Sequence, residues 1–356
     1  MNLFLDANAH LPMNSKALKA YQDFINSPAG HGHPSSPSEP GRLAATALEE
    51  SRAKIASLIG AESARQIIFT SSCTQAAEWG IKIFLENSLG MDTYSAPIEH
   101  PAVRDAFLNL SEKEPQMLEV NENGTVIINE KTNKNIICIH LQNEIGTIQP
   151  IEEFNSNYLF SDISQSLGKI PVNVTDLKID IAIAGAHKFA GPGGVGFIYL
   201  KNPEDWSAFG SGSRYFLDRP GTPDVAGIVA TAAALEESIS TLPDRTNKMT
   251  EFQTVLENYL KNIGVEIIGV NAKRSPNTTF IHLPDGKGIQ TCFKLGQHQI
   301  YVGLGSACGS VHAGPSHVIK ALGKIAGAHD FLRISQYGEY GEKEANHLIK
   351  ILEKVL

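Results

Sequence analysis

Apolar residues in the first two thirds of the chain fall into short continuous runs, separated by longer stretches with helical spacing. The runs predict buried strands at 66–70, 136–141, 158–161, 180–184 and 195–200, with a weaker strand at 93–96. Helical spacing of apolar residues at 43–59, a hydroxyl-rich helix start at 71–74 and Pro101 place helices between strands. Strands that alternate with helices predict a three-layer α/β domain with a mostly parallel sheet.

The pattern changes after about residue 246, where helices and strands no longer alternate regularly. A long amphipathic helix at 248–263 precedes short strands at 265–268 and 278–283, and further helices are expected at 288–295, 316–322 and 342–356. This arrangement indicates a smaller α+β domain. We therefore expect an N-terminal arm at 1–15 that packs with the small domain, a large domain at 16–245 and the small domain at 246–356.

Polar side chains follow five of the predicted strands of the large domain. Ligands of open α/β sheets bind outside the carboxyl ends of the strands, so we expect these side chains to gather around one site. They are Ser71, Ser72, Cys73 and Thr74; His100; Gln142, Asn143 and Glu144; Asp162 and Gln165; and His187 and Lys188.

Lys188 lies at the end of a predicted strand and is followed by a loop with four glycines between residues 191 and 196. A lysine buried at such a place loses part of its charge and becomes a nucleophile for a carbonyl group. The glycines let the backbone pass close to a bound ring or phosphate. Taken alone, the same segment also fits a surface cation beside a flexible loop.

The residue types at this edge of the sheet match the needs of one cofactor, pyridoxal phosphate. That cofactor needs a lysine amine for its Schiff base, a carboxylate on its ring nitrogen, backbone donors for its phosphate and a flat group against its ring. These are supplied in turn by Lys188, Asp162, the helix start at Cys73 and Thr74, and His100. Each residue singly has another interpretation, since Asp162 can cap a helix and His100 can be an ordinary loop histidine. Their combination indicates the cofactor.

Composition and charge narrow the class of protein. The 356-residue chain carries a net charge of −8 without a block of Lys and Arg, which argues against nucleic acid as a partner. No apolar run approaches the roughly 20 residues that span a membrane, and the first residues do not resemble a signal peptide. Four cysteines without a C-x-x-C pair argue against a zinc site or a disulfide framework. We expect a cytoplasmic protein without a bound metal.

A set of short motifs is spread over nearly the whole chain. They are Leu5-Asp6, Gly32-His33-Pro34-Ser35-Ser36, Phe69-Thr70-Ser71-Ser72-Cys73-Thr74-Gln75, Glu99-His100, Asn143-Glu144-Ile145-Gly146, Asp162-Ile163-Ser164-Gln165-Ser166-Leu167-Gly168, Arg219-Pro220-Gly221-Thr222, Gly305-Ser306-Ala307-Cys308 and Leu332-Arg333-Ile334-Ser335. Together they resemble the motifs of class V, fold-type I pyridoxal-phosphate enzymes, specifically the cysteine desulfurases of the NifS/IscS-like group. The motif at 305–308 is the most specific to the desulfurase branch. The resemblance implies the transferase fold of type I, in which the large domain binds the cofactor.

The resemblance also implies a role for each residue that matches a motif. Lys188 would form the Schiff base and move the α-proton of the substrate. Asp162 would pair with the pyridinium nitrogen, Gln165 would hydrogen-bond the phenolic oxygen, and His100 would stack on the ring and serve as an acid or base. The phosphate would be held by Cys73, Thr74 and His187, and by Thr222 of the neighbouring subunit, which implies a homodimer.

On the substrate side, the resemblance implies that Arg333 clamps the carboxylate with the help of Asn143, which is also expected to contact the cofactor. Cys308 would attack the sulfur of L-cysteine and carry it as a persulfide, from which a sulfur-acceptor protein could take it. The small residues around Cys308 favour an exposed thiol, although a free cysteine is often a small buried apolar residue. Cys138 and Cys292 lie within apolar runs, which predicts core positions. At the helix start, a Cys73 thiolate would be stabilised.

Three positions depart from the family pattern, in which they are usually threonine, glutamate and serine. They are His10, Gln75 and Gly185, and the early loop also has Pro37-Ser38-Glu39 in place of a histidine. Loss of the hydroxyl at 185 would weaken cofactor binding by about 1 kcal/mol. The substrate therefore stays open between L-cysteine and another amino acid. The alternatives to a desulfurase are another class V enzyme, either an aminotransferase or a β-lyase, and a non-catalytic scaffold.

Overall fold

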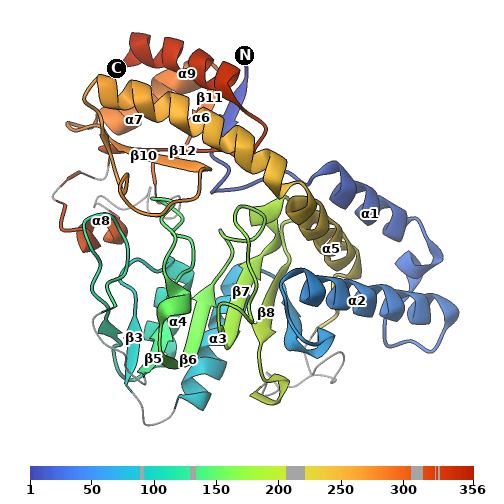
Figure 1. Cartoon of the computed structure of the whole chain (residues 1–356). Helices are drawn as coiled ribbons and strands as arrows, with labels where there is room; N and C mark the ends of the chain where they lie inside the picture. The colour runs from blue at the N-terminus through green and yellow to red at the C-terminus, as the bar shows by residue number, and fades with distance from the viewer. Residues whose placement is uncertain (89–91, 129–133, 206–220, 306–315, 325, 328) are drawn as a thin grey trace.

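A seven-stranded sheet lies at the centre of the larger part of the chain (Figure 1). The computed structural model describes residues 1–88, 92–128, 134–205, 221–305, 316–324, 326–327 and 329–356. The order of the strands is β2 (Ile67–Thr70), β8 (Gly196–Leu200), β7 (Ile181–Gly185), β6 (Ser156–Asp162), β5 (Lys134–Ile137), β3 (Thr93–Ser95) and β4 (Gln116–Met117). β8 runs antiparallel to β2 and β7, and the other pairs are parallel, so the expected mostly parallel sheet is confirmed.

Helices cover both faces of this sheet. One face carries α3 (Cys73–Asn87) and α4 (Pro101–Leu110), and the other carries α1 (Ser15–Ile25), α2 (Glu39–Leu58) and α5 (Val225–Ser240). Successive side chains of a strand point to opposite faces. Accordingly, Ile181 and Ile183 of β7 join the core beneath α3 and α4, whereas Ala182 and Ala184 join the core on the other face. The expected three-layer architecture is therefore confirmed.

The helix α5 was not predicted from the sequence. It is rich in alanine and buries residues around most of its circumference, so the chain shows no polar stripe with helical spacing there. Its start is marked by Asp224, whose side chain accepts a hydrogen bond of 2.9 Å from the backbone N–H of Gly227. α5 packs against both α1 and α2.

A three-stranded antiparallel sheet forms the centre of the C-terminal part, in which β10 (Thr278–His282) lies between β12 (Phe331–Ser335) and β9 (Glu266–Ile267). Its core joins apolar residues from α6 (Leu242–Asn262), α7 (Lys287–Gln297) and α9 (Glu342–Val355). α6 begins before residue 246, so the expected domain boundary falls inside a helix. The division into 1–15, 16–245 and 246–356 stays a prediction.

The N-terminal arm runs between the two sheets. Its strand β1 (Leu3–Leu5) pairs in parallel with β11 (Ile300–Val302), and Leu3 and Leu5 are fully buried in the core of the C-terminal part. Farther along, the backbone N–H of Leu11 donates to the carbonyl of His187, at 3.3 Å. The arm therefore forms a two-stranded sheet with β11 of the C-terminal part and also contacts the turn that follows β7.

The remaining described elements are short. They are the helix α8 (His317–Ala321) and the 3-10 turns η1 (Pro28–His31), η2 (Ala64–Gln66), η3 (Ile151–Glu153), η4 (Ala186–Phe189) and η5 (Pro203–Asp205). Among the described residues no single helix has the length and apolar composition to cross a membrane; α5 and α6 meet that test only as a pair, bent by 63°.

Candidate active site

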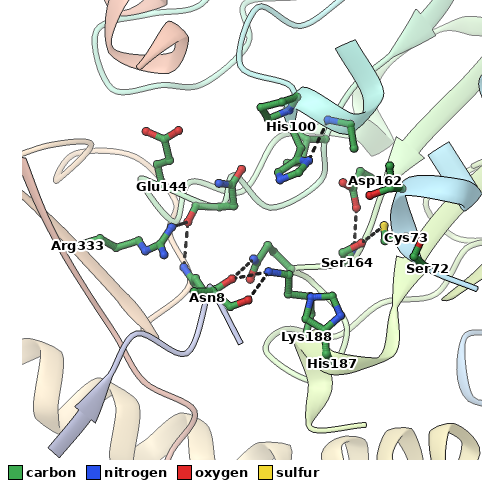
Figure 2. A pocket seen from close by; sticks show the side chains of 17 residues that line it. Asn8, Ser72, Cys73, His100, Glu144, Asp162, Ser164, His187, Lys188 and Arg333 are labelled. Carbon is green, nitrogen blue, oxygen red and sulfur yellow. Dashed lines mark hydrogen bonds between the residues drawn. The ribbon is translucent and has the colours of Figure 1, made fainter. Parts of the chain in front are cut away.

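A cavity of about 310 Å³ opens at the carboxyl edge of the large sheet, between that sheet and the C-terminal part (Figure 2). It is lined by Asn8, Ala9, Ser72, Cys73, Thr74, His100, Pro101, Ala102, Ile139, Asn143, Glu144, Asp162, Ser164, Gln165, His187, Lys188 and Arg333. Of the site residues expected from the sequence, Thr222 is exposed and does not line the cavity of its own chain. Cys308 lies outside the described residues. The other expected cofactor and substrate residues meet in this one cavity, whereas Ser71 and Gln142, which were also expected to gather at the strand ends, do not line it.

The start of α3 offers backbone donors to the cavity. The hydroxyl of Ser72 caps the helix by accepting a 3.1 Å bond from the N–H of Gln75. Cys73 and Thr74 occupy the first two helical positions, where an α-helix provides no carbonyl partner for the N–H group. Because the helix dipole adds positive potential at this end, the geometry suits a phosphate or another anion.

The side chain of Cys73 fills the space beside Gly185. Its Sγ lies 3.1 Å from Oγ of Ser164, and a Cβ placed on Gly185 would lie 3.0 Å from the Cβ of Cys73. Burial, followed by the nearby Asp162, raises the pKa of the Cys73 thiol. The expectation of a stabilised thiolate is therefore wrong, because the desolvation of a buried anion outweighs the helix start.

Asp162 and His100 are each oriented by a backbone N–H group. Oδ1 of Asp162, at the end of β6, accepts a 2.8 Å bond from the N–H of Ser164. Nδ1 of His100 accepts a 3.1 Å bond from the N–H of Ala102 at the start of α4. Burial lowers the pKa of His100, although Asp162 acts in the opposite direction. The imidazole is therefore neutral, with its proton on Nε2.

Lys188 belongs to the turn η4 that follows β7. Its Nζ donates to the backbone carbonyls of Asn8, at 2.8 Å, and Ala9, at 2.7 Å. The neighbouring His187 stacks on His10, with ring centroids 5.6 Å apart. Burial and then the charge of Lys188 lower the pKa of His187 to about 4, so its ring is neutral at physiological pH. The N-terminal arm thus supplies both the acceptors for Lys188 and the partner ring for His187.

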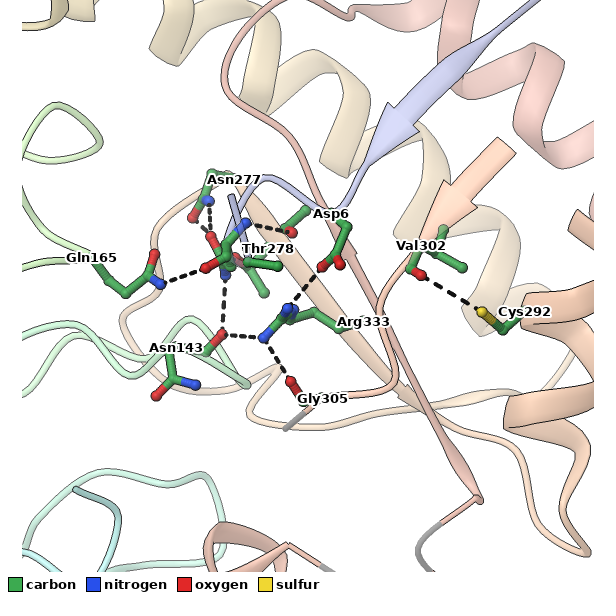
Figure 3. A network of polar contacts seen from close by, with 12 residues as sticks. Asp6, Asn143, Gln165, Asn277, Thr278, Cys292, Val302, Gly305 and Arg333 are labelled. Carbon is green, nitrogen blue, oxygen red and sulfur yellow. Dashed lines mark hydrogen bonds and ion pairs between the residues drawn. The ribbon is translucent and has the colours of Figure 1, made fainter. Parts of the chain in front are cut away.

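Arg333 projects from β12 and is almost fully buried (Figure 3). Nη1 donates to the backbone carbonyls of Asn143, at 3.0 Å, and Gly305, at 2.7 Å, and Nη2 pairs with Oδ1 of Asp6 at 2.7 Å. Its Nε has no acceptor within the described part of the chain. Because Arg333 also lines the cavity, its guanidinium is a candidate partner for an anionic ligand group.

Asn8 is a central residue of the site that the sequence did not reveal. Its backbone carbonyl accepts from Gln165 Nε2 at 2.9 Å as well as from Lys188, and its Nδ2 donates to the carbonyl of Asn143, at 3.1 Å, and to Thr278 Oγ1, at 2.8 Å. Its Oδ1 accepts from Asn277 Nδ2 at 2.9 Å. Asn8 therefore joins residues of both sheets. In the sequence, Asn8 stands out only as a polar residue two positions after Asp6, which does not indicate a role in the site.

Comparisons with known proteins agree with this architecture. The model of the family described as aminotransferase class-V matches residues 3–348. The chain is 33% identical to a protein of Dictyoglomus turgidum named cysteine desulfurase IscS, over 99% of this chain and 94% of that protein. It is similar to a solved NifS-like protein, with a TM-score of 0.86 and 29% identity over 100% and 99% of the two chains. A solved NifS-like protein from Rickettsia africae gives a TM-score of 0.84 at 25% identity, over 100% and 99%.

Proposed function

Because the chain belongs to the class V aminotransferase family, we propose that its cavity binds pyridoxal phosphate and that it acts as a cysteine desulfurase. The reaction would convert L-cysteine to L-alanine and transfer the sulfur to a thiol of the protein. The observation that carries this proposal is the meeting of Lys188, Asp162 and His100 beside a helix start, in a chain whose relatives include proteins named cysteine desulfurase.

The residues that line the cavity fit the proposed cofactor. The N–H groups of Cys73 and Thr74 can receive the phosphate, and the neutral ring of His187 lines the same cavity. The carboxylate of Asp162 can pair with the ring nitrogen, and the flat imidazole of His100 can lie against the ring. When bound, pyridoxal phosphate supplies a conjugated ring that accepts the electron pair released at the α-carbon of an amino acid.

Asp162 and Lys188 hold and move protons in this proposal. Asp162 holds a proton on the ring nitrogen of the cofactor, and its own orientation is fixed by the N–H of Ser164. Lys188 attaches the cofactor and moves the α-proton of the substrate. The carbonyls of Asn8 and Ala9 accept from its amine in this structure and would hold the free amine between rounds of proton transfer.

His100 is held in one orientation and can donate a proton into the cavity. The N–H of Ala102 occupies its Nδ1, so Nε2 carries a proton that can be donated into the cavity. The low pKa of this imidazole keeps the ring uncharged beside the cofactor. Gln165, which lines the same cavity, presents its amide to the phenolic oxygen.

Arg333 and Asn143 form the proposed carboxylate site. The guanidinium of Arg333 supplies the positive charge, while Asp6 and the carbonyls of Asn143 and Gly305 hold it in place. Cys308 is proposed as the sulfur acceptor. Its thiolate attacks the sulfur of the substrate, the carbon–sulfur bond breaks, and the atoms balance as cysteine plus thiol giving alanine plus persulfide.

The assembly and the partners are also proposals. We assign a homodimer in which Thr222 of the neighbouring subunit reaches the phosphate; its exposed position outside its own chain's cavity supports this assignment. A sulfur-acceptor protein would take the persulfide sulfur from Cys308. The cytoplasmic setting and the domain boundaries stay predictions from the sequence.

A product assay tests the proposed reaction. Purified holoenzyme is incubated with L-cysteine and a reductant, and alanine and sulfide are quantified; equal amounts of both are expected. Amino transfer to a keto acid without sulfide release would instead select another class V enzyme. A protein that does not bind pyridoxal phosphate would refute the enzyme assignment and favour a scaffold.

A further inference from the structure

Lys169 lies directly behind the wall of the cavity. It follows Gln165 by four residues, is 1% exposed, and donates from Nζ to Oε1 of Gln165 and to Oδ1 of Asn8, the latter at 3.3 Å. Throughout the described part of the chain, no carboxylate lies within ion-pair distance of this amine. A buried lysine without an acidic partner is costly, so its retention calls for a specific role.

The contacts of Gln165 determine which way its amide points. Nε2 faces the carbonyl oxygen of Asn8, which can only accept, and Oε1 faces the amine of Lys169, which donates. The reverse orientation would set Oε1 against the Asn8 carbonyl and Nε2 against the Lys169 amine. With Oε1 turned toward Lys169, the second hydrogen of Nε2 is available on the side of Gln165 that lines the cavity.

The orientation of Asn8 is fixed independently. Its Nδ2 donates to the carbonyl of Asn143, so its Oδ1 must be the atom that faces Lys169 and Asn277. Lys169 therefore meets two oxygen acceptors, neither of which can turn away without losing other bonds. This arrangement fixes the position of the amine and polarises the amide of Gln165.

We propose that Lys169 is a positioning residue for the cofactor: it holds the amide of Gln165 with Nε2 toward the cavity and strengthens the hydrogen bond that Nε2 donates to the phenolic oxygen. This inference rests on the cofactor part of the proposed function and does not depend on the substrate. Burial and the charges of Lys188, Arg333 and Arg245 lower the pKa of Lys169. Lys169 touches neither the substrate nor the reacting atoms.

The test is a pH titration of the visible absorbance of the bound cofactor, without substrate. A donor to the phenolic oxygen stabilises negative charge there, so loss of this donor raises the midpoint pH of the absorbance change. We expect Lys169→Met and Gln165→Met each to raise it by about 0.5 to 1 unit, the equivalent of one hydrogen bond. Cofactor affinity of the apoprotein should fall about 5-fold in each. Lys178→Met, an exposed lysine in the same loop, is the matched control and should change neither quantity.

The double variant Lys169→Met/Gln165→Met distinguishes positioning from a general effect of charge or packing. If Lys169 acts through Gln165, the double variant shows no further shift beyond Gln165→Met. Additive shifts would overturn the proposal, because the lysine would then act through space or through the fold. So would the absence of any shift in Lys169→Met.

A crystal structure of the wild-type holoenzyme gives an answer that does not depend on how the variants fold. It should place Gln165 Nε2 within hydrogen-bond distance of the phenolic oxygen, with Oε1 toward Lys169; a Gln165 amide that does not contact the cofactor would overturn the proposal. Wild-type protein that binds cofactor but lacks desulfurase activity would refute the proposed reaction while leaving this test intact.

Discussion

Nζ of Lys188 lies 2.8 Å from the backbone carbonyl oxygen of Asn8, and these residues are 180 positions apart in the chain. The lysine that we assign to the cofactor therefore donates to the backbone of the N-terminal arm. The same carbonyl also accepts from Gln165. Docking of the arm and order in the site are consequently linked, since loss of the arm would remove a hydrogen-bond acceptor from both side chains.

Asn8→Ala should lower the free energy of unfolding by about 2 to 4 kcal/mol, because buried groups of Lys169, Asn277 and Thr278 each lose a hydrogen bond. Urea unfolding of the apoprotein measures this change. Asn2→Ala, an exposed position in the same arm, is the control and should have little effect. Equal stability of the two variants would show that the Asn8 network contributes nothing.

Asp162→Asn should reduce kcat by about 10² to 10³, because a neutral amide cannot hold the proton on the ring nitrogen as a carboxylate does. The amide oxygen can still accept from the N–H of Ser164, so the melting temperature should hardly change. Steady-state kinetics and thermal unfolding separate the two effects. A large loss of stability with unchanged kcat would argue for a purely structural Asp162.

Gly185→Ser should perturb the site although the family usually has serine there, because the added side chain would meet Cys73 at 3.0 Å. Cys73→Ala frees this space. We expect the single variant to lower cofactor affinity and the pair Cys73→Ala/Gly185→Ser to restore it. Cofactor titration of the apoproteins measures both. Additive effects of the two substitutions would contradict the packing relationship.

Glu144 should make stability depend on pH. Burial raises the pKa of its carboxyl from 4.5 to about 6, with Ser316 and Arg333 acting in the opposite direction. The folded protein thus holds this proton at higher pH than the unfolded chain does. The stability that protonated Glu144 contributes is therefore present below about pH 4.5 and is lost as the pH rises through about 6.

Glu144→Gln removes this titration. Relative to wild type, the variant should gain about 2 kcal/mol of stability between pH 4 and pH 8, following from the size of the pKa change. Urea unfolding across this range is the measurement, and the exposed Glu152→Gln is the control. Parallel pH profiles for wild type and Glu144→Gln would rule out the raised pKa.

The site residues that lie at the carboxyl ends of strands could be predicted from the sequence. Asp162 ends β6, and His100 and Lys188 follow β3 and β7 within a few residues; the carboxyl ends of these parallel strands meet at one edge. Asn8 and Lys169 were not predictable, since their contact joins segments 161 residues apart and leaves no local pattern. The helix α5 was missed for a different reason: burial around most of its circumference removes the polar stripe that marks a helix.

The central claim is that sulfur passes from L-cysteine to Cys308, and peptide mass spectrometry of that cysteine tests it most directly. After brief treatment of the holoenzyme with L-cysteine, one added sulfur on Cys308 is predicted, together with alanine; the buried Cys138 should stay unmodified. Cys308→Ser should accumulate neither persulfide nor alanine beyond a trace. Alanine and sulfide release by Cys308→Ser at the wild-type rate would contradict the account.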